Sequence, residues 1–129
     1  MSKENLDALK QVYADWAVGD WSDASVFDPY AVGVFPDPSP QPLYGLEALG
    51  EYMRRFLESW DDMRMEATDY RQVGDSFVVW VRRSATGKGS GLPLEDRSFH
   101  VWTFRGRRVI RMELFERESD ALNAAGLSE

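Results

Sequence analysis

The single histidine of the chain, His100, lies in a stretch whose residue pattern is typical of a β-hairpin. Residues 98–104 and 109–115 are rich in aromatic and β-branched side chains, which suit paired strands. A two-residue type II′ turn that begins at Gly106 would join them. In that register His100 faces Glu113, and both side chains lie on the same face of the sheet.

The predicted register divides the hairpin into two faces of different character. One face combines the histidine with an acid, a base and several aromatic rings: Ser98, His100, Trp102, Phe104, Val109, Arg111, Glu113 and Phe115. The other face is apolar: Phe99, Val101, Ile110, Met112 and Leu114. A functional site is therefore expected on the mixed face.

His100 has two interpretations. A carboxylate opposite the imidazole would fix its tautomer and favour its charged form, and the pair could then donate a proton to a carbonyl or act as a general base. Taken alone, a lone histidine in a sheet is more often a hydrogen-bonded structural residue. Ser98 shows no sign of activation as a nucleophile, so acyl-enzyme chemistry is not expected. A single histidine in a chain without cysteine also offers too few nitrogen and sulfur ligands for a dedicated transition-metal site.

The elements around this hairpin follow from the spacing of apolar residues. Helical spacing predicts three main helices: 3–18, 46–59 and 119–125. Alternation predicts the strands: 64–72, 77–84, 98–104 and 109–115. Asp20 or Ser22 could cap a further short helix that ends near Phe27, and residues 31–35 are extended. This order predicts one α+β domain over residues 1–129, with helices on one face of a curved antiparallel sheet.

Two predicted loops stand out by their amino-acid composition, one rich in proline and one rich in glycine. Pro36, Pro38, Pro40 and Pro42 forbid a helix or a central strand, so we expect a stiff surface loop that either covers a pocket mouth or only borders it. Residues 87–91 contain Gly-Lys-Gly-Ser, but a phosphate-binding loop needs a helix after it and this one precedes a strand. We therefore interpret residues 87–91 as a hairpin connection.

The overall composition narrows the class of protein. The chain has 129 residues and a net charge of −7, which argues against nucleic acid or an anionic membrane surface as a partner. The absence of cysteine excludes disulfides and thiolate sites, and fits a reducing compartment. No apolar run approaches the ~18 residues of a membrane span, and the N-terminus lacks the core of a signal peptide. We expect a cytoplasmic protein.

The chain is rich in aromatic residues, with five Trp, five Tyr and seven Phe. Rings on the predicted helices fit a core or a pocket wall equally well, because large rings around a curved sheet often leave a cavity. Arg111 opposite Trp102 would fit a cation–π pair, or could meet a polar group of a ligand. The candidate pocket residues are Trp16, Phe35, Phe56, Trp60, Trp102, Arg111 and Phe115.

Five motifs spread over most of the chain are YADWAVGD from Tyr13, PLYGLEAL from Pro42, GKGSG from Gly87, HVWTFR from His100 and RESDALNAAGL from Arg117. Together they resemble the SnoaL-like branch of the nuclear transport factor 2-like superfamily. The resemblance implies a cone-shaped, strongly bent antiparallel sheet wrapped by N-terminal helices, with an apolar pocket inside and a short C-terminal helix. It also implies a homodimer through the outer sheet face, here Phe99, Val101, Ile110, Met112 and Leu114.

The resemblance extends to ketosteroid isomerase, whose hairpin we align on residues 101–104. The alignment places its protonated oxyanion-hole aspartate at His100, so one hydrogen-bond donor replaces another. Its catalytic tyrosine falls within a residue of Tyr13. Its general-base aspartate falls near Phe35, with Asp37 two residues later, and this departs from the family pattern because proton transfer at carbon needs that base.

Epoxide hydrolases of the same fold resemble the chain in a different way. One of their acids falls at His100 and another near Glu113, but Ser98 stands where their arginine should be. Neither known site is therefore intact in this sequence.

The main hypothesis is a cofactor-independent isomerase, cyclase or dehydratase that acts on a small apolar carbonyl compound. His100 would polarise the carbonyl, Glu113 would orient His100, and Tyr13 would donate a second hydrogen bond. Asp37 or Glu113 would move the proton. The alternatives are a non-catalytic, dimeric ligand-binding scaffold and, third, an epoxide hydrolase with a carboxylate-activated water.

Overall fold

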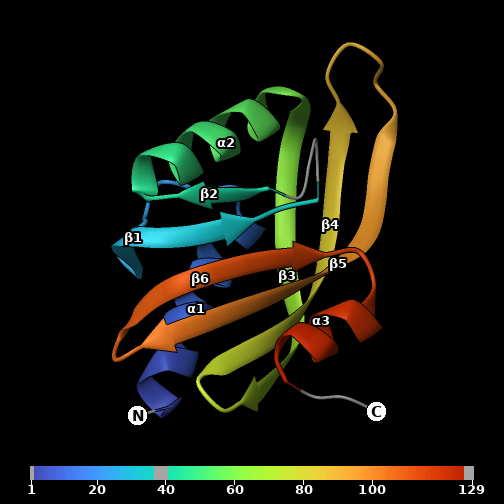
Figure 1. The fold of residues 1–129 in the computed structure, drawn as a ribbon. Coiled ribbons are helices and arrows are strands. Elements are labelled where there is room, and N and C mark those ends of the chain that lie inside the picture. Colours follow the sequence, from blue (N-terminus) through green and yellow to red (C-terminus); the bar gives the residue numbers. More distant parts are fainter. Residues whose placement is uncertain (1, 37–40, 127–129) are drawn as a thin grey trace.

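The computed structural model describes residues 2–36 and 41–126, which form one strongly curved sheet with helices against it (Figure 1). The helices are α1 (Ser2–Ala17), α2 (Leu46–Glu58) and α3 (Glu118–Ala124). The strands are β1 (Phe27–Val34), β2 (Pro42–Tyr44), β3 (Trp60–Val73), β4 (Ser76–Gly87), β5 (Pro93–Arg105) and β6 (Arg108–Phe115). Their order in the sheet is β2-β1-β6-β5-β4-β3, and only β1 and β6 pair in parallel. The predicted α+β class is confirmed.

The bounds of the three main helices lie within one residue of the prediction at each end. The additional short helix predicted after Asp20 is wrong, because residues 18–26 contain no helix and β1 begins at Phe27. The Asp20 and Asp23 side chains instead accept hydrogen bonds from the backbone N–H groups of Ser22 and Ser25. Such local bonds compete with helix formation. Asp37 lies outside the described residues.

The hairpin of β5 and β6 has the predicted turn but a different register. Arg105 pairs with Arg108, and Gly106 has the positive φ of 63° that the first central position of a type II′ turn requires. One extra residue, Ile110, then forms a β-bulge in β6, and the register shifts between Thr103 and Phe104. Beyond the bulge every residue of β6 therefore lies on the face opposite to the one predicted.

The shift corrects the predicted pairing of His100 with Glu113. His100 pairs with Leu114, whereas Glu113 pairs with Val101 on the other face of the sheet. It also corrects the predicted apolar face, because Met112 and Leu114 pack in the same cluster as Trp102.

Two hydrophobic clusters lie on opposite faces of the sheet. On the inner face α1 and α2 cover rings and aliphatic side chains of β3 to β6. On the outer face α3 inserts Ala121, which is fully buried, against Val78, Phe99 and Val101. Phe99 and Val101 are thus covered by the chain's own C-terminal helix. The five residues predicted to form a dimer face do not share one face.

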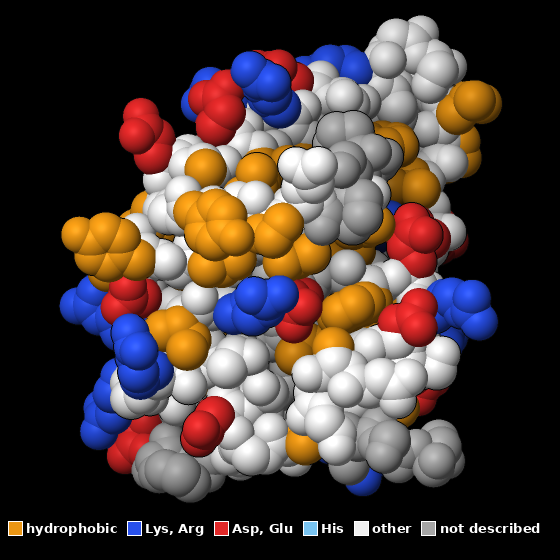
Figure 2. Space-filling view, in the orientation of Figure 1, with side chains coloured by type: hydrophobic (Ala, Val, Ile, Leu, Met, Phe, Trp, Pro, Cys, Tyr) orange, Lys and Arg blue, Asp and Glu red, His pale blue; other side chains and the backbone are white. Residues whose placement is uncertain are grey.

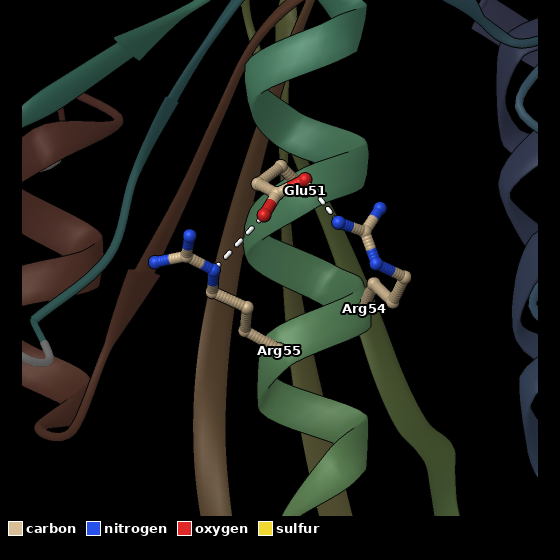
Figure 3. A network of polar contacts seen from close by, with 3 residues as sticks. All are labelled: Glu51, Arg54 and Arg55. Atoms are coloured by element: carbon tan, nitrogen blue, oxygen red, sulfur yellow. Dashed lines mark hydrogen bonds and ion pairs between the residues drawn. The ribbon is translucent and has the colours of Figure 1, made fainter.

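The exposed side of α2 is charged. Arg54 and Arg55 lie about one turn along the helix from Glu51, and both contact its carboxylate (Figure 3). Such exposed pairs contribute little stability, so α2 is held to the sheet by its apolar side.

No helix in the described ranges is long and apolar enough to cross a membrane.

Candidate functional site

His100 lies at the centre of a buried polar network that joins β5 to α1. Its Nδ1 atom is 2.6 Å from the Tyr13 hydroxyl oxygen, and Trp102 Nε1 donates a hydrogen bond to the same oxygen at 2.8 Å. On the other side of the ring, Nε2 is 3.4 Å from Ser98 Oγ. His100 and Trp102 are 0% exposed and Tyr13 is 3% exposed. The network is therefore closed to solvent.

Sequence spacing explains why these side chains meet. Ser98, His100 and Trp102 alternate along β5, so all three point to the inner face of the sheet. Tyr13 and Trp16 lie three residues apart on α1 and therefore share the helix face that packs on the sheet. The sequence placed Tyr13 and His100 at one site as two separate donors to a carbonyl, whereas in the structure the two side chains are hydrogen-bonded to each other.

The hydrogen bonds assign the proton on the imidazole. With the Trp102 N–H donating to the Tyr13 oxygen, every proton of the network has an acceptor when the Tyr13 hydroxyl donates to His100 Nδ1 and the ring proton on Nε2 faces Ser98 Oγ. Burial, with a smaller contribution from the positive charge of Arg83, lowers the pKa of His100 to about 3. Burial also raises the pKa of Tyr13 well above its usual value. Both groups are therefore neutral at pH 7.

This environment limits what the network can do chemically. Both imidazole nitrogens have partners, and within the described residues no buried side-chain nitrogen or oxygen lacks one. An imidazole with a pKa of about 3 is a weak base at pH 7. The geometry corresponds more closely to the structural interpretation of His100 than to the chemical one. A ligand would reach His100 only if a neighbouring ring moved.

Glu113 and Arg111 lie on the outer face of the sheet, away from His100. Arg111 Nη2 is 3.3 Å from Glu113 Oε2, and the two side chains are 44% and 15% exposed. The predicted cation–π pair between Arg111 and Trp102 is wrong, because Trp102 packs on the inner face among Tyr13, Trp16 and Phe27. Epoxide hydrolysis would need the Glu113 carboxylate at the cavity, so this alternative loses its motivating residue.

A cavity of about 160 Å³ lies beside the buried network, between α1, β1 and α2. Its described lining residues are Trp16, Trp21, Asp23, Ala24, Phe27, Phe35, Leu46, Leu49, Gly50, Tyr52, Met53 and Met112. Trp16 links the cavity to the network, because its ring centroid is 5.3 Å from that of Tyr13 and 6.4 Å from that of His100. Neither His100 nor Tyr13 is among these residues.

The sequence located this cavity only in part. Of the seven candidate pocket residues, Trp16 and Phe35 line it. The other five are not among its described lining residues: Phe56, Trp60, Trp102, Arg111 and Phe115. Phe115 instead packs with the cluster on the outer face of the sheet.

Several lining residues were missed in the sequence for different reasons. Met53 belongs to the helical stripe of α2, so periodicity could have identified it. Met112 was assigned to the wrong face by the register error. Trp21 and Asp23 lie in the irregular segment 18–26, where no pattern indicates which side chains turn inward.

A second, larger hollow of about 320 Å³ lies along the outward side of α1. It is lined mainly by polar and charged side chains, including Glu4, Gln11, Asp15 and Arg107. Asp23 borders both spaces. Neither hollow offers a metal site, and the described part of the chain contains no group of three or more His, Asp or Glu side chains that could hold a metal ion.

The SnoaL-like domain family matches residues 2–112, and the chain belongs to this family. A protein assigned as a SnoaL-like polyketide cyclase from Jannaschia sp. CCS1 has a similar structure, with a TM-score of 0.79, 17% identity and coverage of 98% of this chain and 94% of that one. A hypothetical protein with a ketosteroid isomerase-like fold from Catenulispora acidiphila DSM 44928, in complex with trimethylamine, is also similar. Its TM-score is 0.71 and its identity is 15%, and the match covers 97% of this chain and 94% of that one. A protein assigned as an isomerase from Bacillus subtilis has a TM-score of 0.72 and 17% identity, and the match covers 96% of this chain and 93% of that one. No curated protein matches the chain significantly.

Proposed function

We propose that this SnoaL-like protein binds a small, largely apolar molecule in the cavity beside Trp16. The observation that carries the proposal is the lining of the cavity, where aromatic rings and methionines surround about 160 Å³ of space. An apolar cavity of ~150 Å³ is large enough to bind benzene. A ligand with one ring, or a compact branched ligand, therefore fits.

The similar proteins support a role for this cavity. Two of them are assigned as a polyketide cyclase and an isomerase, and a third is in complex with trimethylamine, a small organic molecule. Their identity to this chain is between 15% and 17%, so they support the fold rather than a particular substrate.

Toluene is a suitable first probe because Trp16 and Trp21 both line the cavity. Titration of the protein with toluene should change its tryptophan fluorescence and raise its melting temperature, since a ligand that binds only the folded state stabilises it. A saturable change would support the proposal. An absence of any change up to the solubility limit of toluene would contradict it.

The position of the ligand can be tested on α2. A side chain added at Gly50 would meet no atom within 4 Å at its Cβ, and Gly50 lines the cavity. Because Gly50 is exposed at the rim of the cavity, the side chain of Gly50→Leu should cover part of its entrance and weaken toluene binding by about tenfold or more. Glu47→Leu is the matched control, because it adds the same side chain to an exposed position of α2 outside the described lining. Equal affinities of the two variants would place the ligand elsewhere.

A second candidate function is acid–base catalysis on a carbonyl compound by Tyr13 and His100. The observation that favours it is the 2.6 Å hydrogen bond between them, directly behind the cavity residue Trp16. Movement of the Trp16 ring would give a ligand access to the Tyr13 hydroxyl, which would turn from His100 Nδ1 to the carbonyl oxygen while a water molecule takes the proton from the α-carbon and returns it at the γ-carbon.

The isomerisation of a β,γ-unsaturated ketone tests this second candidate. Tyr13→Phe and His100→Gln should each lower the rate at least tenfold if the two groups act on the substrate. Glu113→Gln is the control, because Glu113 lies on the outer face and should not affect the rate. Equal rates for wild type and His100→Gln would remove His100 from the chemistry.

A further inference from the structure

We propose that the preferred ligand of the cavity is a cation, namely a small ammonium compound with apolar substituents, held by the aromatic lining and by Asp23. This inference rests on the binding function proposed above and names the class of ligand. It follows from two features of the lining, the number of aromatic rings and the sign of its charge.

The first feature is the aromatic lining. Five of the described lining residues are aromatic: Trp16, Trp21, Phe27, Phe35 and Tyr52. They include two pairs of rings in contact, since the centroids of Trp16 and Trp21 are 5.2 Å apart and those of Phe35 and Tyr52 are 4.3 Å apart. The faces of aromatic rings carry negative electrostatic potential and attract cations, and sites lined by several aromatic rings recognise quaternary ammonium compounds.

These aromatic pairs come from different elements. Trp16 belongs to α1 and Trp21 to the segment that follows it, whereas Phe35 follows β1 and Tyr52 belongs to α2. Tertiary packing therefore brings the two pairs to one cavity. A ligand placed between these elements would meet rings from several directions, as a cation needs once most of its water is removed.

The second feature is the charge of the lining. Asp23 is the only charged residue among the described lining residues, and no described lysine or arginine accompanies it. The Ser25 backbone N–H donates a hydrogen bond to Asp23 Oδ1 at 2.9 Å, and this bond lowers the pKa of the carboxyl group. Asp23 is therefore ionised at pH 7, and because its side chain is exposed it borders the cavity from the solvent side. The net charge of −7 also favours approach of a cation over that of an anion.

The larger hollow outside α1 does not offer the same combination. It also contains Asp23, but it includes the cation Arg107, and its described lining has no aromatic residue. An ammonium ligand would lack aromatic contacts there. The ligand is therefore assigned to the smaller cavity.

Two probes of the same shape separate charge from apolar contact. Phenyltrimethylammonium and tert-butylbenzene differ only in a central nitrogen that carries a positive charge and a central carbon that does not. Both are titrated into the intact protein at low ionic strength while tryptophan fluorescence is recorded. We expect the cation to bind about tenfold more tightly than its neutral counterpart.

The carboxylate is tested with Asp23→Asn, which keeps an oxygen to accept the Ser25 hydrogen bond. This variant should lose most of the preference for phenyltrimethylammonium and leave the affinity for tert-butylbenzene unchanged. Asp69→Asn is the matched control: it removes the same charge from an exposed position on β3, where Asp69 also accepts a backbone hydrogen bond. It should not change the preference.

The possible outcomes distinguish this inference from the function on which it rests. If tert-butylbenzene binds as tightly as the cation, the inference is overturned while binding of a small apolar molecule stands. If neither compound binds, the inference is overturned, and the toluene titration alone decides whether the proposed function stands. If Asp23→Asn weakens both probes equally, the carboxylate maintains the shape of the cavity instead of recognising charge, and the inference is again overturned.

Discussion

At the scale of single residues, the environment of His100 determines how the protein responds to pH. The imidazole is fully buried, and its folded-state pKa of about 3 lies well below the 6.5 of an unperturbed histidine. At pH values between these two pKa values, the unfolded state therefore binds a proton at His100 and the folded state does not. The stability that the neutral imidazole contributes to the folded state is fully present above about pH 6.5, and it is lost progressively as the pH falls toward 3.

We therefore expect the free energy of unfolding to fall by about 1.4 kcal/mol per pH unit below pH 6, over and above the effect of the carboxyl groups. Urea denaturation at pH 7, 6 and 5 measures this slope. His100→Gln should flatten it, because the chain has no other histidine to titrate in this range. Ser98→Ala, which keeps the imidazole, should retain the slope. Equal slopes in wild type and His100→Gln would show that the imidazole is not the group responsible.

The Tyr13 hydroxyl is the second residue-scale test. It pairs with both His100 and Trp102, so Tyr13→Phe leaves two buried polar groups without their partner. The cost should be about 1–3 kcal/mol in the free energy of unfolding. Tyr30→Phe removes the same atom from a side chain that is 86% exposed and should change stability by less than about 0.5 kcal/mol. Similar losses in the two variants would contradict the role assigned to the network.

At the scale of elements, α2 packs closely on β1 because β1 has a glycine at the point of contact. A Cβ added to Gly33 would lie 2.2 Å from Leu49 Cδ2 and 2.8 Å from Phe35 Cε2. Both neighbours line the cavity. The spacing between α2 and the sheet therefore determines the shape of the cavity as well as stability.

Alanine substitutions of two glycines should accordingly have opposite effects. Gly33→Ala should destabilise the protein by about 1–3 kcal/mol through overpacking and should also weaken toluene binding, because Leu49 and Phe35 must shift. Gly50→Ala should stabilise it by about 0.5–1 kcal/mol, since Gly50 lies inside α2 and its new methyl group meets open space. Thermal and urea unfolding of both variants measure these effects. A destabilising Gly50→Ala would mean that the space is not open.

At the scale of the whole molecule, none of the described helices covers the outer face of the sheet over β1, β2 and part of β6. Figure 2 shows hydrophobic side chains gathered over this region, with basic and acidic side chains beside them. In the observed register, Val32 pairs with both Tyr44 and Arg111, and Val34 pairs with Glu113. In a two-fold symmetric dimer the same patch of both subunits meets, so Arg111 of one subunit would lie close to Glu113 of the partner subunit.

We therefore expect a homodimer through the face defined by Val32, Val34, Arg111 and Glu113, in place of the five residues expected from the sequence. Arg111→Glu would set two like charges side by side and should favour the monomer in sedimentation velocity. Combining it with Glu113→Arg should restore the dimer, because the pair is reversed on both subunits. Arg105→Glu, at the exposed end of β5, is the control. A wild-type monomer at micromolar concentration would contradict the prediction.

The sequence by itself determined the three helices, the four long strands and the family, but not the short strand β2 or the irregular path of residues 18–26. Apolar residues at helical spacing located α1 and α2, because a helix buries one stripe of its surface, and Gly106 located the hairpin turn because that position needs a positive φ. The resemblance also placed Tyr13 near His100, although the direct hydrogen bond between the two side chains was not predicted.

Only the tertiary structure decided the register of β6 and the composition of the cavity. Both faces of β5 are apolar, since α1 covers Trp102 on one side and α3 covers Val101 on the other, so alternation alone could not show where Ile110 would bulge. That single bulge moved Glu113 away from His100 and brought Met112 to the cavity. Trp21 and Asp23 line the cavity through an irregular segment whose path is set by long-range packing, which no local pattern records.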